Sequence, residues 1–200
     1  KMKRPAKSTV SALRALAADF TPRPDNTSTW TTSEEFISRL QAAGQRLFYW
    51  PAPNGYPDNQ IAWSSTGSLG MTLKLLPRLL EMHQTNGSVG SPFIADVQAQ
   101  TLATFPNAAD RTAAKIIGYW CDRILGFRPT QTYAVALDFF RQEAAATAAI
   151  DIVTDQVDSG VAQHTGKWHL VTGQLSQHYT IARLRVAIGL ILCSPEFLRR

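Results

Sequence analysis

The sequence lacks the long hydrophobic run that a membrane-spanning helix needs. Its most hydrophobic stretch, residues 186–193, is short and follows Arg183 and Arg185, whereas a spanning helix takes about 20 apolar residues. We therefore expect no transmembrane segment. Because 44% of the 200 residues are hydrophobic, the chain has enough apolar surface to build the core of one domain over residues 1–200.

Strand-like alternation of apolar and polar residues is missing as well, and no repeat of fixed period is present. Apolar residues recur instead at steps of three and four, which is typical of amphipathic helices. The fold class predicted from this pattern is all-α: an irregular bundle of about six to eight helices.

Start and stop signals place these helices. Ser8 or Thr9 is expected to cap the first, and Ser91-Pro92 to open another. A central, largely buried helix is expected from about Asp110 to Gly126. The next is predicted to run from Thr130 to about Ile152. The last long helix is predicted to run from near Leu170 to Leu192. Its Tyr179, Val186 and Leu190 are expected to face inward, with Arg183 and Arg185 turned away from the core. Ser194-Pro195 is expected to start a short terminal helix.

Cysteine is scarce, and recognisable catalytic motifs are missing. Cys121 and Cys193 lie far apart in apolar helical contexts and are interpreted as small core residues, although they could pair if the protein is exported. No Gly-x-Ser-x-Gly elbow, zinc-protease pattern or phosphate loop is present. We therefore predict no cofactor, and the sequence favours a non-enzymatic role without excluding an enzyme.

The formal charge of +5 does not indicate a nucleic-acid-binding protein. Five of the 20 basic residues precede the first acid, Asp19, and the 15 that remain equal the 15 acidic residues in number. A basic leader of this kind is usually a solvated tail, and no basic stripe recurs later. We expect no nucleic-acid partner.

Three carboxylates suggest one candidate metal site. Asp151, Asp155 and Asp158 follow at steps of four and three, which on a continuous helix would place them on one face. Such a cluster would suit Ca²⁺ or Mg²⁺. The alternative is that the helix has already ended and the three acids are solvated.

The most distinctive stretch is the aromatic segment, residues 48–63, with the sequence FYWPAPNGYPDNQIAW. Its prolines exclude a helix, and Asn54-Gly55 marks a turn. Its five aromatic rings bury enough apolar surface to hold an ordered loop across the helices. Either all the rings face the core, or one or two form a binding platform, for which the candidate residues are Trp50, Tyr56, Asp58 and Trp63.

Three blocks of the chain resemble the bacterial family catalogued as domain of unknown function eighteen-hundred. They are Ser8-Thr9-Val10-Ser11-Ala12-Leu13-Arg14-Ala15-Leu16, then Gly44-Gln45 with Pro51 to Asp58 and Trp63, and finally Leu192-Cys193-Ser194-Pro195-Glu196-Phe197. The resemblance implies that only the later, C-terminal half of such a protein is present, so Lys1 is expected to be a boundary made by cleavage or cloning. It also implies an exported protein in the periplasm or on the cell surface, often encoded beside a sulfatase-like partner.

The family that the chain resembles has no established activity. We therefore expect an exported bacterial helical domain that is a structural or protein-interaction module and uses the aromatic segment as its contact surface. The alternative is a hydrolase or carbohydrate-binding protein, in which Trp50 and Tyr56 would stack against sugar rings and Asp58 would act with a second acid.

Overall fold

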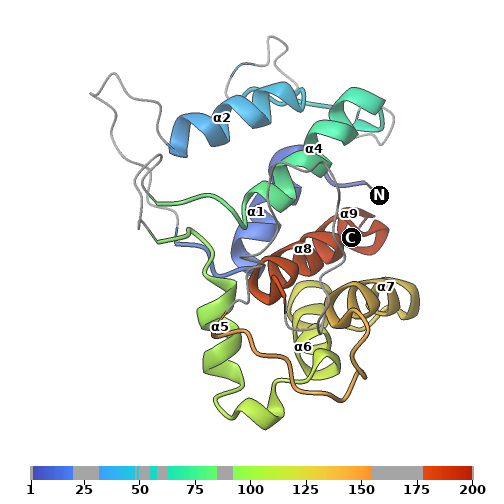
Figure 1. Cartoon of the computed structure of the whole chain (residues 1–200). Helices are drawn as coiled ribbons and strands as arrows, with labels where there is room; N and C mark the ends of the chain where they lie inside the picture. Colours follow the sequence, from blue (N-terminus) through green and yellow to red (C-terminus); the bar gives the residue numbers. More distant parts are fainter. Residues whose placement is uncertain are drawn as a thin grey trace, which may run out of the picture.

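The predicted all-α class is confirmed in the computed structural model, which describes residues 2–19, 32–47, 49, 55–57, 63–84, 92–154 and 178–199. Within these ranges the backbone forms eight α-helices and one 3₁₀ turn, and isolated β-bridges join His83 with Phe93 and Thr112 with Ala149 (Figure 1). The helices are α1 (Pro5–Ala15), α2 (Thr32–Ala42), α4 (Thr66–Arg78), α5 (Val97–Thr104), α6 (Ala113–Leu125), α7 (Thr130–Arg141), α8 (Thr180–Leu192) and α9 (Pro195–Arg199), and the 3₁₀ turn η1 is Ala108–Asp110.

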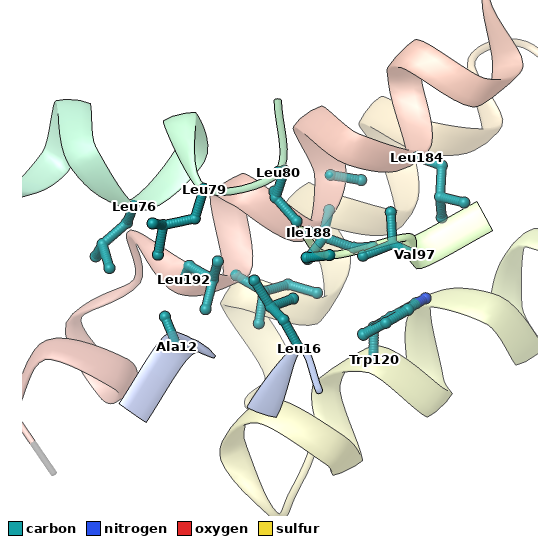
Figure 2. Packing of buried hydrophobic residues seen from close by; sticks show 14 of the residues in the cluster. Ala12, Leu16, Leu76, Leu79, Leu80, Val97, Trp120, Leu184, Ile188 and Leu192 are labelled. Carbon is teal, nitrogen blue, oxygen red and sulfur yellow. The ribbon is translucent and has the colours of Figure 1, made fainter. Parts of the chain in front are cut away.

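Helix α8 lies in the middle of the assembly. It packs against α4, α5, α6, α7 and α9, and Figure 1 shows it between the α1–α4 pair and the α6–α7 pair. The core is one cluster of buried apolar side chains, in which Leu76 of α4 and Leu79, just after α4, lie near Leu192 of α8, and Trp120 of α6 lies below Val97 (Figure 2). Burying each such side chain contributes about 1.5–3 kcal/mol, so this cluster stabilises the arrangement of the helices.

Helix α6 confirms the predicted central helix. Thr112 begins it by accepting a hydrogen bond from the backbone N–H of Lys115, and Gly126 ends it in the left-handed conformation, with φ of 76°. Only glycine adopts that conformation without cost, which is why the sequence signal was reliable. Its Trp120 is fully buried, and the indole N–H donates to Thr101 Oγ1 of α5 at 3.0 Å.

The predicted orientation of α8 was wrong. The side chain of Arg183 is buried and its Nη1 donates to the carbonyl of Phe140 at 2.8 Å, whereas Val186 is 45% exposed and Leu190 38% exposed. Tyr179 is also exposed and precedes the helix, which begins at Thr180 and not within the predicted range near Leu170. Since α8 is apolar on nearly every face, its periodicity did not determine which face turns inward.

Two predicted helix starts were also wrong. Pro5 occupies the first turn of α1, so Ser8 and Thr9 lie inside the helix, where both are buried. Proline suits that position because its missing N–H would have no partner there. Asp96 caps α5 by accepting from the backbone N–H of Ala99, after the predicted Ser91-Pro92 start.

Helix α7 is shorter than predicted, whereas α9 is as predicted. The α7 helix ends at Arg141 and not near Ile152, because Gln142 has φ of 53° and the backbone N–H of Ile150 then donates to the carbonyl of Arg111. Ser194 caps the short α9, since its Oγ accepts from the N–H of Phe197.

The two ends of the described chain are joined. The backbone N–H of Lys3 donates to the carbonyl of Leu198 at 2.7 Å, and the Lys3 ammonium lies 3.8 Å from the centre of the Phe197 ring. Contact between a cation and an aromatic face is attractive. The start of the chain is therefore held against α9.

Candidate functional site between helices α2 and α4

Helices α2 and α4 are clamped together at both ends. Ser68, in the first turn of α4, donates its hydroxyl to the carbonyl of Ala43 at 2.7 Å, just after α2 ends. At the other end, Arg78 of α4 donates to Glu35 of α2 at 2.9 Å. The two helices therefore run antiparallel and frame a fixed surface.

The Glu35 carboxylate stays ionised in this clamp. Burial alone would raise its pKa, but hydrogen bonds from Arg78 and Arg39 outweigh burial and hold the pKa below 4.5. Thr32 and Glu35 have the spacing of a capping box, and the side chain of Thr32 lies outside the described residues. The carboxylate of Glu35 instead binds the two arginines.

Two rings of the aromatic segment donate hydrogen bonds to backbone carbonyls. The hydroxyl of Tyr56 donates to the carbonyl of Arg46, and Trp63 Nε1 donates to the carbonyl of Pro57 at 2.8 Å. The two ring centroids are 5.9 Å apart. Trp63 is buried, so its indole forms a wall of the site. Trp50 and Asp58, the other two predicted platform residues, lie outside the described residues, and their roles stay predictions.

A hollow of about 290 Å³ opens where the aromatic segment meets the two helices. Gly44 adopts φ of 87° directly after α2, which turns the chain out of the helix and leaves space beside it. Over the described residues, the lining combines apolar surface with hydroxyl groups and includes no charged side chain; these residues are Ala42, Ala43, Gly44, Pro57, Trp63, Ser65, Gly67 and Ser68. Such a lining suits a neutral group with one or two hydrogen-bonding atoms.

Tyr49 is the exposed ring of this segment among the residues that the structure describes. It is 66% exposed, and the guanidinium of Arg46 lies 3.9 Å from its ring centroid. Its backbone N–H donates to the Arg46 carbonyl, the same oxygen that accepts from Tyr56. The sequence pattern pointed to Trp50 and Tyr56 and not to Tyr49. The available signal was the arginine three residues before it, since arginine often stacks on aromatic rings.

The predicted metal site is described only at Asp151. Its Oδ1 accepts from the backbone N–H groups of Val153 and Thr154, which makes a local turn. Asp155 and Asp158 lie outside the described residues. No group of three or more histidine, cysteine or acidic side chains placed to hold a metal occurs in the part of the chain that the structure describes. The metal site therefore stays a prediction.

Cys121 is buried, Cys193 is partly buried, and neither is among the lining residues of this hollow. Both are free thiols, and burial raises the pKa of each to about 11. A thiol with so high a pKa carries almost no thiolate near neutral pH, and the thiolate is the nucleophile. Neither cysteine has the properties of a catalytic residue.

Comparison with known proteins gives one match. A family model with the description "Protein of unknown function (DUF1800)" matches residues 1–199. No curated protein and no solved structure gave a match to the chain. Over the described residues, no helix is both long and apolar enough to span a bilayer.

Proposed function

The chain belongs to the family described as Protein of unknown function (DUF1800), and because that description names no activity, we propose that it is a protein-interaction module whose contact surface is the hollow between α2 and α4 together with Tyr49. The proposal includes export in a bacterium, to the periplasm or the cell surface, and docking to the sulfatase-like protein that the family resemblance implies.

One observation carries this proposal: the aromatic segment anchors two of its rings and presents a third. The hydroxyl of Tyr56 and the indole N–H of Trp63 each donate to a backbone carbonyl, whereas Tyr49 is 66% exposed beside Arg46. Tyrosine and arginine are enriched among the residues that dominate binding energy at protein interfaces. An exposed pair of these residues on a fixed frame loses little conformational entropy when a partner binds.

The neutral lining of the hollow favours docking over acid–base catalysis. None of the eight lining residues that the structure describes is ionisable, whereas a hydrolytic site usually brings together ionisable groups with shifted pKa values. The described carboxylates with a lowered pKa are instead in ion pairs or hydrogen bonds elsewhere, as Asp122 is with Arg128. A partner's apolar side chain with a backbone group beside it would fit the hollow.

Titration of the purified sulfatase-like protein with the intact chain tests this proposal. Calorimetry should detect binding, and Tyr49→Ala should weaken it by about 30-fold, the effect expected of a residue whose truncation costs about 2 kcal/mol. Arg46→Ala should also weaken binding, because it removes the guanidinium but keeps the carbonyl that Tyr56 uses.

Val135→Ala is the matched control, since Val135 is 53% exposed on α7 and should leave the affinity unchanged. Absence of binding, or equal affinities for wild type and Tyr49→Ala, would reject the proposed docking. Binding of the chain to polysaccharide in place of the protein would favour the carbohydrate alternative.

A further inference from the structure

Helix α8 carries apolar residues on a face that solvent reaches. Its exposed residues include Ala182, Val186 and Leu190, which follow each other at steps of four and form one ridge along the helix. A helix that packs one side on a core normally has polar residues on the other side, and a helix that is apolar all round is normally covered. The outer face of α8 therefore has the composition of a buried surface.

A groove lies directly beside this ridge. It has a volume of about 120 Å³, and Pro77, Gly189 and Cys193 are among its lining residues. A Cβ atom placed on Gly189 would lie 3.4 Å from Cβ of Pro77, so α8 and α4 already touch at the floor of the groove. The patch thus holds an apolar ridge and, beside it, a groove whose lining includes Val186 and Leu190 of that ridge.

The same groove is lined by charges of both signs. Glu81 follows α4, with a side chain that is 60% exposed and 3.4 Å from Arg78. Arg185 of α8 lies along the groove as well, and its guanidinium is 4.0 Å from the centre of the Phe93 ring. An acid and a base in one groove make the patch able to complement itself electrostatically.

We propose that two copies of this chain dock through this α8 face, related by a two-fold axis. In such a dimer the same patch serves both partners, and each residue pairing occurs twice. The ridge of one copy would enter the groove of the other, and Glu81 of each would face Arg185 of the other. Ridges built at steps of four pack into each other at a crossing angle of about −50°, which suits residues 182, 186 and 190.

Sedimentation equilibrium of the intact chain from about 1 to 200 μM tests this proposal. We expect a monomer–dimer equilibrium in which Val186→Glu weakens association by at least about 100-fold, because each substitution buries two carboxylates without partners. Val135→Glu places the same change on an equally exposed valine of α7 and should leave the dimer intact. Circular dichroism melts of both variants establish that they remain folded.

Exchanging the two charges provides a second test, because a mere loss of apolar surface would not produce a rescue of dimer affinity. Glu81→Arg should weaken the dimer, and adding Arg185→Glu should restore part of the affinity, because opposite charges face each other again. A wild-type chain that is monomeric at the highest concentration would overturn the proposal. So would a dimer that is unaffected by Val186→Glu, because it would use another surface.

Discussion

The hydrogen bond between Trp120 and Thr101 gives the sharpest stability prediction. Both residues are fully buried, and the indole N–H of Trp120 has Thr101 Oγ1 as its partner at 3.0 Å. The same hydroxyl donates to the carbonyl of Val97 one turn earlier in α5. Thr101→Val keeps the branched shape but removes the oxygen, so the indole N–H stays buried without an acceptor.

Leaving a buried donor without a partner costs about 1–3 kcal/mol. The added methyl group of valine offsets part of this cost, since burying one carbon contributes about 0.8 kcal/mol. We expect the variant to be less stable by about 1–2 kcal/mol, which for a domain of this size lowers the melting temperature by roughly 2–8 °C.

Thr104→Val is the matched control. Thr104 lies in the same helix, and its hydroxyl also donates one turn back, to the carbonyl of Gln100 at 2.9 Å, but its side chain is exposed and receives no indole N–H. Exposed substitutions of this kind usually change stability by less than about 0.5 kcal/mol. Urea denaturation followed by circular dichroism compares the two variants. Equal free energies of unfolding would refute the importance of the indole hydrogen bond.

Three further predictions concern the remaining polar groups. Ser8→Ala should raise the melting temperature in calorimetry, because the buried Ser8 hydroxyl has no hydrogen-bond partner among the described residues; a lower value would contradict this. The folded-state pKa of Glu35 is below its ordinary value, so the ionised carboxylate stabilises the fold above about pH 4.5 and this stabilisation is lost as pH falls further. Glu35→Gln should therefore flatten the pH dependence of the free energy of unfolding in that acid range. An unchanged pH dependence would count against the clamp. A thiol reagent at pH 8 should modify Cys121 and Cys193 slowly in the native protein and rapidly in denaturant, and fast native labelling would show that burial does not protect them.

Helix α6 shows what the sequence could predict. Its end and its buried face were encoded within a few residues, by Gly126 and by the periodic apolar residues before it, whereas its start was expected near Asp110 and is set by Thr112. Local signals of this kind need no knowledge of the rest of the fold.

Helix α8 shows where such signals fail. Arg183 reads as a solvent-facing residue, yet it is buried because the carbonyl of Phe140, 43 positions earlier, accepts its Nη1. The partner exists only after α7 and α8 have packed. No local rule distinguishes Arg183 from Arg185 in advance.

The non-helical character of the candidate site was predictable from the sequence, but the identity of its exposed ring was not. Prolines and aromatic rings correctly indicated a non-helical segment around Tyr56. Which ring stays exposed depends on hydrogen bonds that form only in the folded chain, namely Tyr56 to Arg46 and Trp63 to Pro57. These bonds anchor Tyr56 and Trp63 and leave Tyr49 outside, and the residue order alone does not encode that outcome.

The hydrogen bond from Lys3 to Leu198 also constrains the order of events during synthesis. Lys3 is synthesised long before Leu198, so the carbonyl that accepts its N–H is in place only after α9 has been made. The backbone around Lys3 must therefore wait for α9 before it can adopt its final position, and removing α9 would loosen the residues that precede α1.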